Sequence, residues 1–264
     1  MDLEKKKEEL TLSLKALDSL LIGFSGGVDS TFLLAVAHQV LKEKVIAVTS
    51  SSPIHPSKEI KQAISFTKKF GIKHIIIESK EFEKIDFLSN EKDRCYICKR
   101  YFFEELEKIA LNFNLKYIAH GANLDDLNDF RPGFKAAYEK GIIAPLIDAK
   151  LKKEDIRMLS KKMNLFTWNK PSMACLATRI PYGIPISIEL LKKIEQAEDI
   201  ILNIGIKTCR LRYHGQIARI EVMPEDFELL LKNRVILNTE LKKFGFSYIT
   251  IDLEGYKQGS LNSK

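Results

Sequence analysis

The stretch that decides the fold is LIGFSGGVDS, residues 21–30, in which an apolar run ends at Ser-Gly-Gly and a helical pattern follows. Gly26 and Gly27 allow a tight turn that brings backbone N–H groups close to an anion, and the start of a helix favours negative charge. Ser25 and Ser30 add hydroxyl donors. No lysine precedes Ser30, which argues against the phosphate loop of kinase-like and GTPase-like enzymes. The stretch therefore predicts an anion site of another kind between a strand and a helix.

Strands and helices alternate on both sides of this stretch. The patterns predict strands at 20–24, 44–49, 73–78 and 116–120, and helices at 3–19, 31–41, 58–70, 101–113 and 152–163. This alternation predicts parallel strands joined by right-handed crossovers, hence an α/β fold with helices on both faces of an open sheet. We expect ligands at the carboxyl ends of its strands.

The pattern changes after Lys150. Three prolines and a glycine in TWNKPSMACLATRIPYGIPIS, residues 167–187, predict a long functional loop. Beyond it we predict a small α+β domain with helices at 187–203, 225–232 and 237–244 and strands at 208–213, 217–222 and 248–253. The predicted domains are therefore residues 1–184 and 185–264.

The composition is that of a globular protein. No apolar stretch approaches the length of a membrane span, and the first residues are charged, unlike a secretory signal, so we expect a cytoplasmic protein. The net charge of +7 favours an anionic partner such as a nucleotide, a nucleic acid or a phosphorylated metabolite. A lysine-rich surface that serves solubility explains the charge equally well.

SGGVDS, residues 25–30, resembles the pyrophosphate loop of the ATP pyrophosphatase superfamily, whose members release pyrophosphate and adenylate an oxygen of their substrate. An ordinary glycine turn is the alternative. The resemblance implies that Asp29 helps to hold Mg²⁺ against the phosphates. It implies that ATP contacts Ser25, Gly26, Gly27, Asp29 and Ser30, and that adenosine lies at the end of the second strand, at Ser50 and its neighbours.

An adenylated substrate needs a nucleophile that displaces AMP, and sulfur in this role would require cysteines. The chain has four, Cys95, Cys98, Cys175 and Cys209. Cys-x-x-Cys in a cytosolic protein indicates metal or redox chemistry more often than a structural disulfide. Three thiolates can hold three irons of a [4Fe-4S] cluster and leave the fourth iron open for hydrosulfide. We favour this for Cys95, Cys98 and Cys175 over zinc, a redox disulfide or accidental spacing. Cys209 falls in a predicted strand, where we expect it to be buried and inert.

The chain resembles the LarE family of ATP-dependent sulfur transferases from near Leu20 to Asn262. The segments that carry this resemblance are GFSGGVDSTFLLAVA, RCYICKRYFF, HGANLDD, KPSMACLATRIPYG, CRLRYHGQIARIEV and YITIDLEGYKQGSLN. The resemblance implies that ATP adenylates the carboxylates of pyridinium-3,5-biscarboxylic acid mononucleotide and that sulfur displaces AMP. The thiocarboxylate product is the precursor of the nickel-pincer nucleotide cofactor of lactate racemase. The resemblance also implies a homo-oligomer, such as a hexamer, with the second domain serving substrate binding and oligomerisation.

The family obtains sulfur in two ways. Some members sacrifice a cysteine at the position of Cys175 and are left with dehydroalanine, whereas others add the Cys-x-x-Cys pair and are thought to carry sulfide on a [4Fe-4S] cluster. All three cysteines are present here, so we predict the cluster version with sacrifice of Cys175 as the alternative. The predicted catalytic residues are Cys175, Asp29 and Arg179, and Arg179 would shield the charge of the attacking sulfur or contact a substrate phosphate.

Charged residues in the second domain have predicted roles as well. Arg210 and Arg212 lie two apart on one face of a strand, which suits the phosphate of a mononucleotide, as in the family, or a solvated basic face. Glu198 and Glu221 match acidic positions that bind a divalent metal near an oligomer interface in the family.

The fourth strand is followed by further polar residues. Asn123 and Asp126, with Asp125 between them, would orient the α-phosphate, Mg²⁺ or the adenylated carboxylate, unless Asp125 caps a helix. Arg131 stands either near the nucleotide or in a simple turn.

Three other functions stay open. A tRNA thiolase would combine this loop with cysteines around an iron–sulfur cluster, but we find no RNA-binding module and no aromatic-rich basic sheet, so we do not expect a nucleic acid partner. An ammonia-using ligase gives the cysteines no role. A nucleotide sensor would bind ATP without exchanging labelled pyrophosphate.

Overall fold

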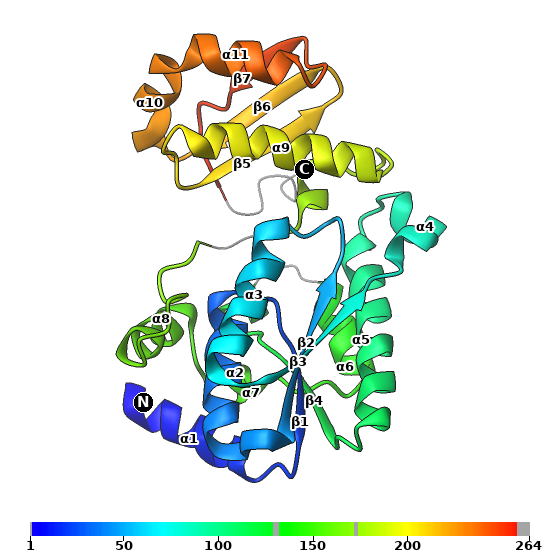
Figure 1. Cartoon of the computed structure of the whole chain (residues 1–264), viewed down its shortest axis with the longest axis vertical. Coiled ribbons are helices and arrows are strands. Elements are labelled where there is room, and N and C mark those ends of the chain that lie inside the picture. Colours follow the sequence, from blue (N-terminus) through cyan, green and yellow to red (C-terminus); the bar gives the residue numbers. More distant parts are fainter. Residues whose placement is uncertain (1, 129–131, 172–173, 258–264) are drawn as a thin grey trace. The chain divides into compact units, whose positions relative to one another are not determined.

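The computed structural model describes residues 2–128, 132–171 and 174–257, and the chain forms two compact units (Figure 1). The first unit comprises Met1–Ser52, Ser57–Phe87 and Lys92–Met173. The second comprises Pro53–Pro56, Leu88–Glu91 and Ala174–Lys264. In the described residues no helix combines the length and the apolar character that a membrane crossing requires.

A parallel four-stranded sheet forms the centre of the first unit. Its strands are β1 (Leu20–Gly23), β2 (Val45–Ser51), β3 (Lys73–Glu78) and β4 (Tyr117–His120), in the order β3-β2-β1-β4. The predicted open parallel sheet is confirmed. Side chains of β1 alternate between two cores, with Leu20 and Ile22 in one and Leu21 in the other. Because both faces are covered, the strand reads as a continuous apolar run.

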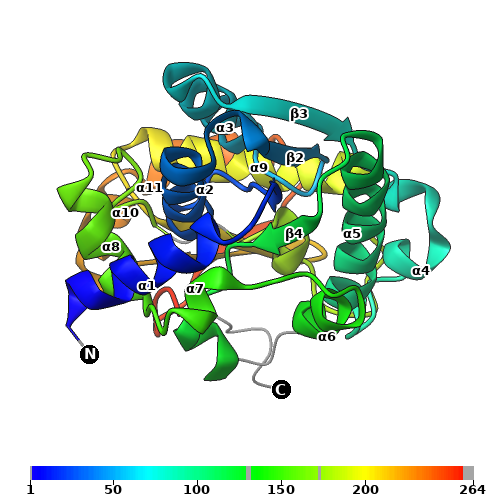
Figure 2. The same ribbon diagram turned by 90° about the horizontal axis from the view of Figure 1, so that it is seen from below.

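Helices cover both faces of this sheet (Figures 1 and 2). One face carries α1 (Leu3–Lys15), α2 (Val28–Leu41), α3 (Ser57–Phe70) and α8 (Lys153–Lys162), and the other carries α5 (Arg94–Asn112) and α6 (Pro132–Glu139). Shorter elements are α4 (Ile85–Leu88), α7 (Pro145–Asp148), and the 3₁₀ turns η1 (Lys42–Lys44), η2 (Glu81–Glu83) and η3 (Leu124–Asn128). Helix α2 is buried on nearly all sides because α1 and α8 pack on it from outside the sheet.

Two helical regions differ from the expectation. Helix α5 begins at Arg94 instead of Tyr101, because Ile97 joins Phe103 and Leu106 on the buried face, a signal that the surrounding charges hide in the sequence. Helices α6 and α7 were not predicted. Each starts with a proline, which reads as a breaker in the sequence but is well suited to the first helical position.

The second unit contains a three-stranded sheet, which confirms the predicted small α+β region. Strands β5 (Cys209–His214) and β6 (Ile217–Val222) are antiparallel, and β7 (Tyr248–Ile251) runs parallel to β6. The core of the unit contains Leu211 and Ile220 together with residues of the helices. The helical elements are α9 (Ile188–Asn203), α10 (Phe227–Lys232), α11 (Arg234–Lys242) and the 3₁₀ turns η4 (Leu176–Arg179) and η5 (Pro224–Asp226).

Backbone hydrogen bonds explain why two short segments belong to the second unit. The Leu176 N–H donates to the carbonyl oxygen of Ile54 at 2.7 Å, and the Ile186 N–H donates to that of Leu88 at 2.9 Å. These bonds attach residues 53–56 and 88–91 to the chain after Ala174. The functional domains at 1–184 and 185–264 stay a prediction.

Candidate functional site

The glycine turn after β1 forms an open cradle at the start of α2. Gly26 has φ of +70°, and a Cβ there would lie 3.3 Å from the Cβ of Ala63, so glycine suits both the backbone and the space. The hydroxyl oxygens of Ser25 and Ser30 are 3.0 Å apart. Gly27 is the N-cap of α2 and supplies no side-chain acceptor, so the first-turn N–H groups are available to an anion.

A second glycine lets β4 approach this turn. A Cβ on Gly121 would lie 2.8 Å from the backbone N and Cα of Ser30, closer than real Cβ atoms approach backbone. The residues after β4 therefore lie against the first turn of α2. This contact brings the predicted residues after β4, Asn123 and Asp126, close to the glycine turn within the first unit.

A buried polar chain fixes the end of β1 just before the turn. Thr49 donates its hydroxyl proton to the carbonyl oxygen of Phe24 at 2.6 Å, and His74 Nε2 lies 2.8 Å from the same hydroxyl. Thr67 lies 2.9 Å from His74 Nδ1. Burial lowers the pKa of His74 to about 4, so the ring is neutral at pH 7 and we assign the proton to Nε2. Ser50, the predicted adenosine contact, is half-buried near the carboxyl end of β2.

Asp29 lies in the first turn of α2 with its two carboxylate oxygens in different surroundings. Oδ2 accepts a hydrogen bond from the ammonium group of Lys153, whereas Oδ1 is buried and has no hydrogen-bond partner among the residues that the structure describes. Burial raises the pKa of Asp29, Lys153 opposes this rise, and the charge of Asp126 adds to it. A buried carboxylate oxygen without a donor is suited to a cation. With Asp126 nearby, it fits Mg²⁺, which proteins bind through one or two carboxylates and substrate phosphates.

The loop after β4 is organised by its own side chains. The Asn123 N–H donates to Asp126 Oδ2 at 2.9 Å, and the Asp125 N–H donates to Asn123 Oδ1 at 2.9 Å. Asp125 Oδ2 accepts from the backbone N–H of Lys153, the first residue of α8, at 2.8 Å. Asp125 therefore accepts a hydrogen bond at the start of α8, a helix far along the chain whose own N-cap residue is Lys152. Arg131 lies outside the described residues.

Among the described residues, sequence reasoning missed three charged side chains, the half-buried Lys153 and Lys170 and the buried Glu81. Lys170 binds the carbonyl oxygen of Gly26 at 3.0 Å and Glu59 at 2.7 Å. Lys153, described above, is the second. Glu81 accepts a hydrogen bond from Ser52, and burial raises the pKa of Glu81. Nothing in the local sequence distinguishes the two lysines from the other basic residues, because each finds its partner only through the fold.

The predicted cluster ligands divide between the two units. Cys95 and Cys98 are half-buried in the first turns of α5, one turn apart on the same side of the helix, where the helix dipole favours thiolates. Cys175 is half-buried in the second unit, just before η4. Among residues 2–128, 132–171 and 174–257, the structure gathers no set of three His, Cys, Asp or Glu side chains as metal ligands.

The buried side chain of Arg179 binds the backbone around Cys175. Its side chain is fully buried, and Nε and Nη2 bind the two carboxylate oxygens of Glu198 at 2.9 and 3.0 Å. Nη1 donates to the carbonyl oxygens of Ala174 and Cys175 at 2.7 and 3.0 Å. Burial would lower the pKa of Arg179, but Glu198 outweighs this effect and raises it. Arg179 therefore positions the Cys175 segment through its backbone.

The other predicted arginines lie on the same strand. Arg210 and Arg212 are 3% and 4% exposed, so the solvated basic face considered as an alternative is wrong. Arg212 binds both carboxylate oxygens of Glu221, at 3.0 and 2.8 Å, and donates to the carbonyl oxygen of Thr178. The Arg210 guanidinium lies 5.1 Å from the centre of the Tyr256 ring. Burial lowers the pKa of Arg210, and Arg179 adds to the effect.

The two predicted metal-binding glutamates are engaged by arginines in this structure. Both oxygens of Glu198 accept from Arg179, and Oε1 also accepts from the Leu211 N–H at 2.8 Å. Glu221 accepts from Arg212 and from Arg219. A divalent cation at either carboxylate would have to displace a guanidinium group, and metal binding there stays a prediction.

Replacing Glu198 with Gln is expected to destabilise the protein by about 3–5 kcal/mol, because the buried Arg179 charge loses its partner. Asp199→Asn removes the same charge from an exposed neighbour and is expected to change stability by less than about 0.5 kcal/mol. Urea unfolding of both variants measures the difference. A loss below about 1 kcal/mol for Glu198→Gln would show that the pair contributes little to the fold.

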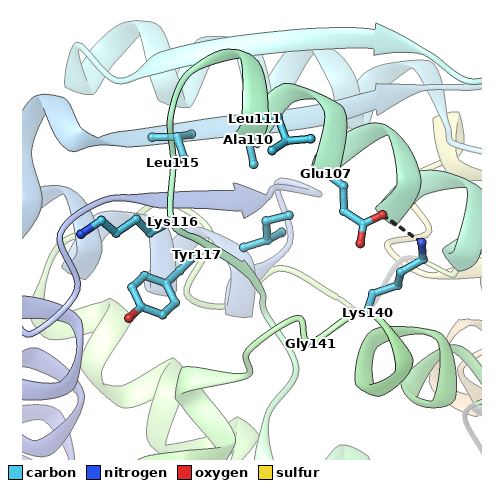
Figure 3. Close-up of a pocket in the computed structure, with 9 residues that line it drawn as sticks. Glu107, Ala110, Leu111, Leu115, Lys116, Tyr117, Lys140 and Gly141 are labelled. Atoms are coloured by element: carbon cyan, nitrogen blue, oxygen red, sulfur yellow. Dashed lines mark hydrogen bonds and ion pairs between the residues drawn. The ribbon is translucent and has the colours of Figure 1, made fainter.

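A pocket of about 400 Å³ lies at the opposite end of β4 from the glycine turn (Figure 3). Leu111 and Leu115 line it together with Tyr117, and an ion pair of 2.9 Å between Lys140 and Glu107 borders it. None of the predicted site residues lines this pocket.

Comparison with known proteins identifies the family. A family model described as NAD synthase matches residues 7–99, which include the glycine turn. The glutamine-hydrolyzing GMP synthase of Aeropyrum pernix is 23% identical over 67% of this chain and 38% of its own length. An uncharacterized protein of Synechocystis sp. is 37% identical over 98% of both chains. The pyridinium-3,5-bisthiocarboxylic acid mononucleotide synthase of Lactiplantibacillus plantarum is 34% identical over 98% of this chain and 95% of its own. Since this last identity extends along nearly the whole of both proteins, the chain belongs to the LarE family, as its cysteine and glycine motifs indicated.

Proposed function

We propose that the protein is an ATP-dependent sulfur transferase that converts the carboxylates of pyridinium-3,5-biscarboxylic acid mononucleotide into thiocarboxylates. The observation that carries this proposal is the identity with a synthase named for the bisthiocarboxylic product, along nearly the full length of both chains. The product would be the precursor of the nickel-pincer nucleotide cofactor of lactate racemase.

In the first half of the reaction, the glycine turn would bind the triphosphate of ATP. The N–H groups at the start of α2 and the hydroxyls of Ser25 and Ser30, which lie 3.0 Å apart, would donate hydrogen bonds to the phosphates. Asp29 and Asp126 would hold Mg²⁺, which neutralises charge on the departing pyrophosphate. A carboxylate oxygen of the substrate forms a bond to the α-phosphorus as the bond from that phosphorus to the bridging oxygen breaks. The leaving group is pyrophosphate, and an acyl adenylate remains.

The second unit would bind the phosphate of the mononucleotide through Arg210 and Arg212. Burial and the neighbouring Arg179 disfavour the positive charge of Arg210, as its lowered pKa indicates. A phosphate dianion beside Arg210 would relieve this cost, because it supplies the opposite charge. Arg212 already binds Glu221, so we expect it to contribute mainly orientation.

Sulfur would enter in the second half of the reaction. We propose a [4Fe-4S] cluster on Cys95, Cys98 and Cys175 that supplies a sulfide at its open iron. The alternative is that the Cys175 thiolate attacks the acyl carbon, AMP leaves, and a thioester forms. Loss of the Cα proton of Cys175 and cleavage of its Cβ–S bond would then give the thiocarboxylate and dehydroalanine. In both versions Arg179 and Glu198 fix the backbone around Cys175.

Anaerobic purification followed by iron and sulfide analysis separates these two versions. The cluster version predicts about four irons per chain, lost when Cys95 or Cys98 is replaced by Ala. Mass spectrometry of the nucleotide product then reports the gain of sulfur in place of oxygen. A protein without iron that converts Cys175 to dehydroalanine in step with product would exclude the cluster.

The same analysis distinguishes the other functions. Thiolated tRNA with an unchanged mononucleotide would replace the proposal by a tRNA thiolase, and pyrophosphate release that needs only ammonium would replace it by an ammonia-using ligase. A homo-oligomer, such as a hexamer, stays a prediction.

A further inference from the structure

We propose that Lys153 pairs with the Asp29 carboxylate when no nucleotide is bound, and that it moves to a phosphate oxygen of ATP when Mg²⁺ binds to this carboxylate. The inference rests on the proposed use of the glycine turn for ATP. It starts from the two oxygens of Asp29, of which one binds the ammonium group of Lys153 and the other is buried without a donor in the described part of the chain.

Lys153 is anchored at its backbone, and its side chain is partly exposed. Its N–H is bound to Asp125 at 2.8 Å, which anchors the first residue of α8 beside the loop after β4. Its side chain is 33% exposed, against 17% for Asp29, so part of its surface already faces water. A lysine side chain is a point charge on a flexible four-carbon chain, so its ammonium group can change partners while the helix stays in place.

Mg²⁺ and the Lys153 ammonium group compete for the same carboxylate. A dication bound to Asp29 would repel an ammonium group in hydrogen-bond contact with that carboxylate. The triphosphate that accompanies Mg²⁺ brings new anionic oxygens to the start of α2, where the released ammonium group finds strong acceptors. Lys153 would thereby supply the positive side chain that the glycine turn itself lacks.

Lys170 provides a contrast within the same site. Its ammonium group is held by Glu59 at 2.7 Å and by the carbonyl oxygen of Gly26 at 3.0 Å, and its side chain is only 13% exposed. Arg157 also binds the carbonyl oxygens of Trp168 and Lys170, which fixes this segment. We therefore assign a structural role to Lys170, which stabilises the glycine turn, and the exchange between Asp29 and a phosphate oxygen to Lys153.

The test compares Lys153→Met with Lys162→Met. Lys162 lies on the same helix but pairs with Glu4 instead of Asp29, in an ion pair whose two side chains are more than half exposed, so it is a matched control. Calorimetry measures binding of α,β-methylene-ATP with Mg²⁺, and electron paramagnetic resonance measures binding of Mn²⁺ alone. Lys153→Met is expected to weaken nucleotide binding about tenfold or more and to tighten Mn²⁺ binding about threefold or more, because the competing ammonium group is gone. Lys162→Met should change neither value.

Lys153→Arg is expected to restore nucleotide binding to within about threefold, because it keeps the charge. Unchanged nucleotide affinity in Lys153→Met, or unchanged Mn²⁺ affinity, would overturn the exchange. Circular dichroism checks folding, and Lys153→Gln carries the same comparison if the Met variant unfolds. If the wild-type protein binds no nucleotide, the proposed function fails, whereas the Mn²⁺ titration still decides whether Lys153 competes for Asp29.

Discussion

Replacement of Cys175 with Ala is expected to abolish thiocarboxylate formation while ATP–pyrophosphate exchange stays within about threefold of the wild-type rate. Both proposed routes of sulfur need this cysteine, either as a cluster ligand or as the sulfur itself. The residues proposed for adenylation belong to the first unit, and Cys175 belongs to the second. Mass spectrometry of the nucleotide and exchange of labelled pyrophosphate measure the two halves separately.

Cys209→Ala is the matched control. Cys209 is buried in the core of the second unit, and burial raises the pKa of its thiol well above the usual value, so it is not a nucleophile at neutral pH. We expect this variant to make thiocarboxylate. Product formation at the wild-type rate by Cys175→Ala would contradict both routes, whereas a single turnover by Cys95→Ala alone would favour sacrifice of Cys175.

The Asp29→Asn variant is expected to lose pyrophosphate exchange by about a thousandfold or more, because an amide cannot replace a carboxylate as a ligand of Mg²⁺ at the departing phosphates. Asp29 lies in the first turn of α2, and its buried Oδ1 has no donor within residues 2–128, 132–171 and 174–257. The initial rate of exchange with saturating substrate is the measurement.

Asp18→Asn serves as the control for Asp29→Asn. Asp18 also pairs with a lysine, Lys116, but both side chains are more than half exposed. Exposed pairs contribute little, so this variant should keep its activity and its stability. If Asp29→Asn retained more than about a tenth of the exchange rate, another residue would have to hold the metal.

The sequence predicted the sheet and the glycine turn because both depend on local patterns. Apolar runs bounded by turns locate β1 to β4, and glycines followed by a helix locate the anion cradle. Neither signal depends on contacts with distant residues. The start of α5 was placed too late because the charged residues before Cys95 mask the apolar spacing.

Contacts between distant residues could not be predicted in the same way. Lys153 and Asp29 are 124 positions apart, and Lys170 and Glu59 are 111 apart, so no spacing rule joins them. The two-residue spacing of Arg210 and Arg212 in a predicted strand placed both side chains on one face. The spacing could not show that this face is buried. Arg179 was predicted as a catalytic residue in a loop, and its bond to Glu198, 19 positions away, could not be read from the sequence.

The most direct test is to identify the phosphate-containing products that the protein forms from ATP. Phosphorus NMR would follow ATP, Mg²⁺, a sulfide source and pyridinium-3,5-biscarboxylic acid mononucleotide mixed with the protein under anaerobic conditions. The account predicts AMP and pyrophosphate in equal amounts, formed only when the mononucleotide is present. Formation of ADP and orthophosphate, or no cleavage of ATP, would contradict it.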